Sequence, residues 1–217
     1  GKTKLAVQLA DTFSGEIISA DSRQVYKGMN IGTGKDLKEY SINGKQIPYH
    51  LIDIIDPQEE FNLYIFKELF FEMFKNITAR RKQPFLVGGT GLYLSSILQD
   101  YNLSKADFES TKLNLSALSD NELKEMLKNQ NPRLHNTTDL NERDRIIKAI
   151  AVSKAQTDNN DIKNINSLVI GVKLSREEIK KRITVRLKKR LDEEGMIEEV
   201  KSLMDSGVSY DKMIFFG

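Results

Sequence analysis

The stretch "GKTKLAVQLADTFSGEIISADSRQ", residues 1–24, decides the fold. Its first half carries apolar residues at helical spacing, which predicts a helix over 3–13. The segment 16–20, with Ile17, Ile18 and Ala20, is typical of a short strand, and four polar residues follow it directly, beginning with Asp21. Ligands bind at the carboxyl ends of strands in open α/β sheets. The stretch therefore predicts a ligand site beside Asp21.

The first three residues match the end of the phosphate-loop motif G-x-x-x-x-G-K-[ST]. In that motif, backbone amides at a helix N-terminus cradle phosphate, the lysine reaches the outer oxygens and the hydroxyl binds Mg²⁺. Gly1, Lys2 and Thr3 are the matching residues, and the helix and strand that follow them are what the motif requires. The chain starts inside this motif and ends in the apolar run "KMIFFG", so we expect flanking residues at both ends.

Further strands are predicted at 47–55, 84–87 and 168–174, with a helix over 63–81 between the first two. Strands that alternate with helices predict a parallel, doubly wound sheet. With the phosphate-loop motif, the predicted fold class is α/β, of the P-loop NTPase type. The stretch "LVGGTGLY" then places two glycines and Thr90 between a strand and a helix, where Thr90 is either a helix cap or a substrate contact.

The amino-acid composition of segment 101–139 differs from that of the rest of the chain, because it is rich in Asn, Ser, Lys and Asp. The pattern Ser119-x-x-Glu122 predicts the start of a helix there. We therefore expect a small, mainly helical insertion at 101–139 in a catalytic core formed by 1–100 and 140–217.

The composition is that of an ordinary globular chain. The 217 residues are 39% hydrophobic and 29% charged, with a formal net charge of +2 and no cysteine. No apolar run is long enough to span a bilayer, so we expect a cytoplasmic protein without a membrane partner. The run 176–190 holds eight basic and two acidic residues, which predicts either a phosphate-binding face or a solvated helix face.

Six segments together resemble the tRNA dimethylallyltransferases, also called tRNA isopentenyltransferases. They are "GKT", "IISADSRQVYKGMNIGTGK", "IPYHLIDI", "PFLVGGTGLYL", "LHNTTDLNERDRIIKAI" and "EEIKKRITVRLKKRLDEEGMIEEVKSL", and they occur in this order from the first residue onward. Members of that family transfer a dimethylallyl group from dimethylallyl diphosphate to N6 of the adenosine on the 3′ side of the tRNA anticodon, with Mg²⁺. They use a kinase-like phosphate loop on an isoprenoid diphosphate instead of ATP.

The resemblance implies a role for each matching residue. Asp21 is expected to act as the general base and Thr90 to lie beside the reacting adenine, while Arg182 contacts the diphosphate. The remaining implied positions are Gly1, Lys2 and Thr3 for the diphosphate, with Thr3 also on Mg²⁺; Asp21, Ser22, Arg23, Gln24 and Thr90 for tRNA; and Asn141, Glu142, Arg143, Asp144 and Arg145, "NERDR", for tRNA.

The resemblance further implies that the insertion faces the anticodon loop and that the enzyme is a monomer. Two departures weaken the match: the upstream glycine and strand are absent, and so is the family's basic carboxyl-terminal stretch. The insertion is also short, which leaves the extent of the tRNA contact open.

Three other functions remain possible from the sequence. The acceptor could be free AMP, ADP or ATP, although the insertion and the basic helices favour RNA. A phosphate-loop kinase of small metabolites would bind ATP at the first three residues, but no kinase role follows for "DSRQVYKGM". A nucleic-acid-binding protein with a vestigial phosphate loop would bind tRNA without turnover.

Overall fold

The computed structural model describes residues 1–101, 103, 106–130, 140, 142–155 and 165–216. The chain forms two compact units, one of Gly1–Asp100 with Asn164–Gly217 and one of Tyr101–Lys163. The first unit contains the sheet, and the second is helical.

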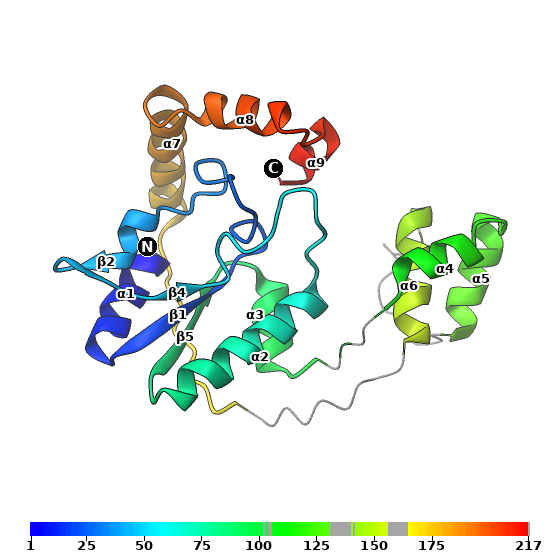
Figure 1. The fold of residues 1–217 in the computed structure, drawn as a ribbon, viewed down its shortest axis with the longest axis horizontal. Helices are drawn as coiled ribbons and strands as arrows, with labels where there is room; N and C mark the ends of the chain where they lie inside the picture. Colours follow the sequence, from blue (N-terminus) through cyan, green and yellow to red (C-terminus); the bar gives the residue numbers. More distant parts are fainter. Residues whose placement is uncertain (102, 104–105, 131–139, 141, 156–164, 217) are drawn as a thin grey trace. The chain divides into compact units, whose positions relative to one another are not determined.

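The sheet of the first unit has β1 (Gly15–Ala20) in its centre, between β4 (Tyr49–His50) and β5 (Gln83–Gly88), and both neighbours run parallel to it (Figure 1). Every residue of β1 is buried, because strands flank it and helices cover it. Ala20 pairs with Gly88, and a Cβ on Gly88 would lie 2.1 Å from the Ala20 carbonyl oxygen. Only glycine lets the two strands approach so closely at the edge where they end.

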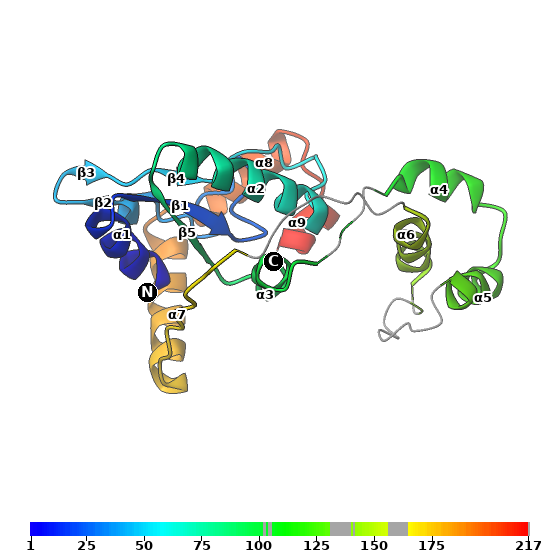
Figure 2. The same cartoon turned by 90° about the horizontal axis from the view of Figure 1, so that it is seen from below.

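Helices cover both faces of this sheet. The α1 helix (Lys2–Thr12) packs Ala6, Val7 and Ala10 against Ile17 on one face. On the other side lie α2 (Leu63–Ala79) and α3 (Gly91–Leu98) (Figure 2). The Phe66 ring of α2 stacks on the Tyr93 ring of α3 with the ring centroids 4.1 Å apart. The predicted α/β class with a parallel sheet is confirmed.

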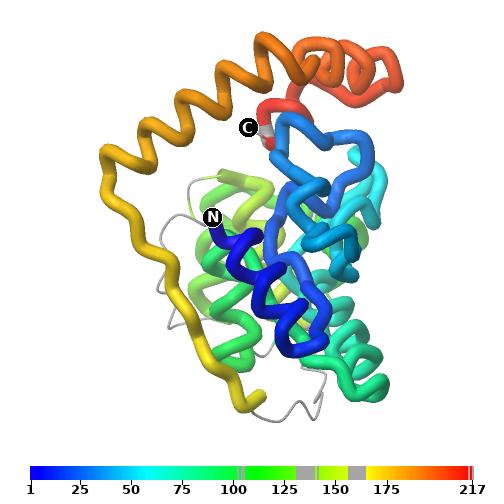
Figure 3. The backbone as a smooth tube through the Cα atoms, turned by 90° about the vertical axis from the view of Figure 1, so that its left-hand side faces the viewer, coloured from blue at the N-terminus to red at the C-terminus, as the bar shows by residue number. Residues whose placement is uncertain are grey.

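The chain between β1 and α2 adds a short helix, η1 (Leu37–Tyr40), and a small antiparallel hairpin of β2 (Ser41–Ile42) and β3 (Lys45–Gln46). Towards the carboxyl end come α7 (Arg176–Asp192), α8 (Met196–Asp205) and α9 (Tyr210–Phe216). Gly195, at φ 81°, separates α7 from α8. Figure 3 shows α8 and α9 beside the blue loop that follows β1.

A shared apolar cluster fixes that arrangement. Val25 and Tyr26, shortly after β1, pack with Leu203 of α8, with Val208 and with Phe216 of α9. The segment after Asp21 is therefore held by residues almost at the other end of the chain.

The second unit consists of α4 (Phe108–Asn114), α5 (Asp120–Gln130) and α6 (Arg143–Lys154). The capping box predicted for α5 is present, because the Ser119 N–H donates to Glu122 Oε2 at 2.7 Å and the Glu122 N–H donates to Ser119 Oγ at 3.4 Å. Compared with the expected insertion at 101–139, the compact unit runs on to Lys163, because α6 packs on α4 and α5. Its core is Leu115, Leu123, Leu127, Ile146, Ile147 and Ile150.

Two predicted strands differ from the structure. Residues 168–174 form no strand, because an extended chain becomes a strand only by pairing, and this one pairs with no described segment (yellow in Figure 3). Its side chains are largely exposed, with Leu168 at 88%. Of 47–55, only Tyr49 and His50 pair with β1, since the backbone turns left-handed at Leu51 and Asp53. None of the described helices is both long enough and apolar enough to cross a lipid bilayer.

Candidate active site

Asp21 follows β1 directly and begins a tight turn. Its Oδ1 accepts the backbone N–H groups of Arg23 at 3.0 Å and Gln24 at 3.2 Å, a local pattern that aspartate favours at turns. Among the hydrogen bonds of the described residues, none involves Oδ2. One carboxylate oxygen thus fixes the turn, and the other is left to accept a proton from a ligand.

Thr90 joins the end of β5 to this turn. The Ser22 N–H donates to Thr90 Oγ1 at 3.1 Å, and the Thr90 hydroxyl lies 3.4 Å from Ser22 Oγ. The Thr90 N–H in turn donates to the Ala20 carbonyl at 3.2 Å. Thr90 is the N-cap residue of α3 by position, but its side chain makes no capping hydrogen bond. Its hydroxyl serves the Asp21 turn instead.

Lys2 reaches the same edge from α1. A Cβ placed on Gly89 would lie 3.7 Å from Lys2 Nζ, so the ammonium group lies beside the glycine that precedes Thr90. The Gly1 side of α1 has no side-chain cap. Unpaired N–H groups and the helix dipole make such an N-terminus attractive to anions. Lys2 and the start of α1 thus give this edge positive charge next to the Asp21 turn.

The negative charge of Asp21 contributes to the raised pKa values of two buried tyrosines, Tyr40 and Tyr93. Burial, followed by the charge of Asp21, raises the pKa of Tyr40 to about 12. Burial also raises the pKa of Tyr93, with smaller contributions from Tyr26 and Asp21. Both phenols therefore stay protonated near neutral pH.

Two other residues predicted to contact a ligand at this edge, Arg23 and Gln24, differ in whether their side chains are already hydrogen-bonded. Arg23 is exposed, so its guanidinium can reach a ligand. Gln24 is already engaged, because its Nε2 donates to the Gly34 carbonyl at 3.0 Å and its Oε1 lies 3.5 Å from Ser19 Oγ. Gln24 therefore supports the turn, and its predicted contact with tRNA stays a prediction.

Thr3 is half-buried in the first turn of α1. In the described part of the chain, no three His, Asp or Glu side chains gather to hold a metal. Mg²⁺ bound together with phosphates needs only one or two protein oxygens, the rest being phosphate oxygens and water. A single threonine hydroxyl beside a phosphate-binding helix end fits that requirement.

Arg182 stands apart from this cluster. Its Nε donates to Glu178 Oε1 at 2.6 Å within α7, and its side chain is 54% exposed. No interaction described here links it to Asp21 or Lys2, so its role at the diphosphate stays a prediction. A shallow hollow of about 300 Å³ lies along the same helix, and its lining residues are Glu178, Lys181, Arg182, Val185, Arg186 and Lys189.

The segment predicted to contact tRNA lies at the start of α6. Arg143 is engaged inside the helical unit, where its Nη1 lies 2.6 Å from Asp120 Oδ1 and its Nη2 donates to the carbonyls of Leu115 and Ser116 at 3.3 and 3.1 Å. Glu142, Asp144 and Arg145 are more exposed. Arg145 pairs with Glu142 at 3.2 Å, and Asp144 pairs with Lys112 at 3.4 Å. Asn141 lies outside the described residues.

Sequence reasoning missed two residues that bind the Asp21 segment. Lys35, in "GTGK", received no role from the sequence, yet it is 2% exposed. Glu199 accepts the backbone N–H groups of residues 30, 31 and 32 at 2.8, 2.8 and 2.9 Å. Nothing in the local pattern indicates either contact, because Glu199 is more than 160 positions from its partners and lysines are mostly exposed.

A parallel α/β sheet whose carboxyl edge holds a lysine, a helix N-terminus and a carboxylate is typical of a phosphate-loop protein. Comparison with known proteins makes the class specific. The model of the family described as IPP transferase matches residues 24–215, and this chain belongs to that family.

Individual relatives agree with this assignment. The tRNA dimethylallyltransferase 1 of Syntrophus aciditrophicus is 46% identical over 224 residues, which cover all of this chain and 73% of that protein. The crystal structure of the tRNA isopentenylpyrophosphate transferase from Bacillus halodurans matches 97% of this chain and 68% of its own at 34% identity and a TM-score of 0.63. A eukaryotic dimethylallyltransferase acting on tRNA matches 95% of this chain and 53% of its own at 26% identity and a TM-score of 0.69.

Proposed function

We propose that this chain transfers a dimethylallyl group from dimethylallyl diphosphate to N6 of the adenosine on the 3′ side of the anticodon in tRNA. One observation carries the proposal. The Asp21 turn, with Oδ2 outside the described hydrogen bonds, is joined through Ser22 and Thr90 to the glycine beside Lys2. A base and a phosphate-binding group thus meet at one edge of the sheet.

The leaving group sets the first chemical requirement. Diphosphate departs only when its growing negative charge is neutralised, because otherwise the charge builds up uncompensated in the transition state. Lys2 and the N-terminus of α1 supply positive charge there, and Thr3 would hold Mg²⁺. When bound, Mg²⁺ neutralises further charge on the phosphate oxygens.

The acceptor sets the second requirement. The exocyclic amine of adenine is a weak nucleophile, since its lone pair is delocalised into the ring. Asp21 Oδ2 accepts the N6 proton as the new carbon–nitrogen bond forms, while Oδ1 keeps the carboxylate in place through the N–H groups of Arg23 and Gln24. A positioned base of this kind accelerates proton transfer by about 10² to 10⁴-fold.

Access to N6 requires the adenine to leave its stack, which costs least in single-stranded RNA such as an anticodon loop. Exposed Arg23 lies next to the base and is suited to contact neighbouring nucleotides. The proposal places the reaction in the cytoplasm, where tRNA is modified. That the enzyme acts as a monomer stays a prediction.

Free AMP, ADP or ATP as the acceptor is the alternative, but the three relatives described above are named for tRNA. The test incubates the protein with labelled dimethylallyl diphosphate and Mg²⁺, together with either tRNA lacking the modification or an adenine nucleotide. We expect label in tRNA only. As a matched control, a tRNA with guanosine at the target position lacks the N6 amine and should stay unlabelled. Label in free nucleotides, or none in tRNA, contradicts the proposal.

A further inference from the structure

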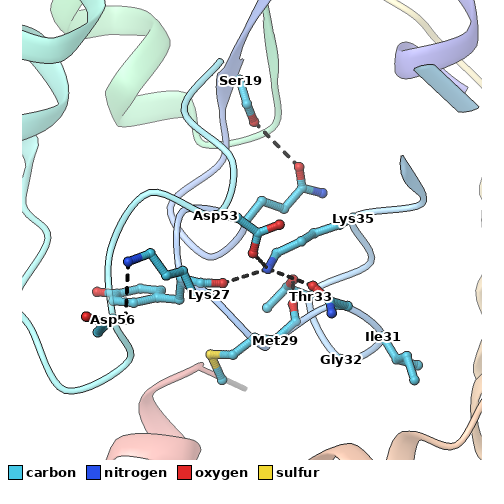
Figure 4. Close-up of polar contacts among 12 residues, drawn as sticks. Ser19, Lys27, Met29, Ile31, Gly32, Thr33, Lys35, Asp53 and Asp56 are labelled. Carbon is cyan, nitrogen blue, oxygen red and sulfur yellow. Dashed lines mark hydrogen bonds and ion pairs between the residues drawn. The ribbon is translucent and has the colours of Figure 1, made fainter. Parts of the chain in front are cut away.

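Lys35 is buried and fully hydrogen-bonded. Its side chain is 1% exposed, and its Nζ donates to the Tyr26 carbonyl at 2.6 Å, to Asn30 Oδ1 at 3.1 Å and to the Asp53 carboxylate (Figure 4). An ammonium group has three N–H donors, so each of them has an acceptor here. Two of the acceptors, on Tyr26 and Asn30, belong to the loop that leads to Lys35, and the third, on Asp53, belongs to a separate segment of the chain. Lys35 holds these segments together.

These parts flank the Asp21 turn. The Asp53 N–H donates to the Gln24 carbonyl at 3.1 Å, and the Ile54 N–H donates to the Val25 carbonyl at 2.8 Å. The chain leaving the turn is thus hydrogen-bonded alongside the segment that carries Asp53. Because Lys35 binds both Asp53 and the Tyr26 carbonyl, it closes the loop 26–35 onto this pair.

A direct connection runs from the loop back to the carboxylate. Gln24 Nε2 donates to the carbonyl of Gly34, the residue before Lys35, and the Gln24 backbone N–H donates to Asp21 Oδ1. A shift of the loop should therefore displace Gln24, whose backbone N–H orients the Asp21 carboxylate. On its outer side, the loop is bound by Glu199 through three backbone N–H groups.

Stability alone does not explain a lysine at this position, because a buried ion pair is often no more stabilising than apolar residues of similar volume. An ammonium group also makes directional hydrogen bonds, so its three acceptors must lie around it in a fixed geometry. We infer that Lys35 is a positioning residue that sets the Asp21 carboxylate in place for the transfer. This inference rests on the proposed function.

The test compares Lys35→Met with Glu16→Gln. Glu16 is also a buried, ion-paired residue, but it lies near the opposite end of β1, where it contacts Arg80 and His50. The Lys35 variant should lower kcat for tRNA labelling by about 10 to 100-fold per folded molecule, because small misplacements of a reacting group cost that much. Its KM for dimethylallyl diphosphate should change less than threefold, since Lys2 takes no part in this network. Glu16→Gln should keep kcat within about threefold.

A second readout does not depend on activity. The Arg23 and Gln24 amides are bonded to Asp21, so their hydrogen exchange should quicken in Lys35→Met and not in Glu16→Gln. If wild-type protein fails to label tRNA, the proposed function fails, while this exchange comparison still tests Lys35. Equal kcat in the two variants, or unchanged exchange at the turn, overturns the positioning role.

Two further variants keep the test decisive if Lys35→Met does not fold. Asn30→Ala removes one acceptor from an exposed residue and should lower kcat in the same direction by a smaller factor. The chain has no cysteine, so Lys35→Cys can be aminoethylated in denaturant at a single thiol and refolded. Recovery of kcat with the restored amine supports the role, and a correctly refolded, aminoethylated product whose kcat stays about tenfold or more below that of wild type contradicts it.

Discussion

The Ser22 N–H donates to Thr90 Oγ1 at 3.1 Å and so joins the ends of two neighbouring strands 68 positions apart in sequence. Through this bond the residue after Asp21 is fixed to the residue that follows the glycine beside Lys2. Asp21 and the glycine beside Lys2 thus share one support, because Ala20 and Gly88, at the ends of β1 and β5, are paired with each other.

Thr90→Val should lower kcat for tRNA labelling by about tenfold, because the Ser22 N–H loses its acceptor and the turn shifts. Thr90→Ser keeps the hydroxyl and should stay within about threefold of wild type. Steady-state kinetics of both variants, at saturating dimethylallyl diphosphate, provide the measurement. A valine variant as active as the serine variant would mean that the hydroxyl does not hold the turn.

Glu16 should make stability depend on pH. Burial raises the pKa of Glu16, but hydrogen bonds and charges from Arg80 and His50 outweigh this and hold it below the ordinary value of 4.5. The stabilising contribution is complete above the unfolded pKa and is lost as pH falls through the folded pKa. Wild-type stability should therefore decline below about pH 4.5 more steeply than that of Glu16→Gln.

Urea unfolding between about pH 3 and pH 7 checks this prediction, because this range runs from below the unfolded pKa of Glu16 to well above it. At neutral pH, Glu16→Gln should lose about 1–3 kcal/mol, since a charged acceptor of two partners becomes neutral. Parallel pH profiles for the two proteins would show that Glu16 is not the group responsible.

Glu199→Ala should destabilise the first unit by about 1–3 kcal/mol, because three N–H groups of the loop lose a charged acceptor. Glu199→Gln retains one acceptor oxygen and should lie between alanine and wild type. Thermal unfolding of the three proteins gives the order. If glutamine and alanine are equally stable, the remaining oxygen contributes nothing, and the contact is weaker than its geometry indicates.

Substitutions at Arg143 and Arg145 should have different effects, because Arg143 supports the helical unit and Arg145 is available to contact tRNA. Arg143→Ala should destabilise the helical unit by about 1–2 kcal/mol, since it loses contacts with Asp120 and two carbonyls. Arg145→Glu should leave stability nearly unchanged, because the pair that Arg145 forms with Glu142 within the described part of the chain is exposed.

If Arg145 contacts a phosphate, its variant should weaken tRNA binding and lower the slope of log affinity against log salt by about 1. Binding titrations at several salt concentrations measure this slope. A slope equal to that of wild type would remove Arg145 from the contact surface.

The sequence predicts those elements whose signals are local. The helix and strand of residues 1–24 follow from apolar spacing, and the start of α5 follows from its capping residue, Ser119. The place of Asp21 follows as well, since polar residues directly after a buried strand must lie at its carboxyl end.

Features that depend on distant partners do not follow from the sequence. Residues 168–174 have strand-like composition, but pairing decides whether a strand forms, and composition does not encode the partner. The left-handed backbone at Leu51 and Asp53 shortens β4, although neither is the glycine that usually marks such a turn. The inward position of Lys35 depends on Asp53 and on the Tyr26 carbonyl, which only the folded chain brings together.

Substitution of the carboxylate tests the central claim most directly. Asn at position 21 keeps an Oδ1 for the Arg23 and Gln24 amides, so Asp21→Asn should fold as wild type and bind dimethylallyl diphosphate with similar affinity. Single-turnover transfer of label to tRNA should fall by about 10² to 10⁴-fold, because the amide cannot take the N6 proton. Transfer at the wild-type rate by a correctly folded Asp21→Asn protein would contradict the claim that Asp21 is the base.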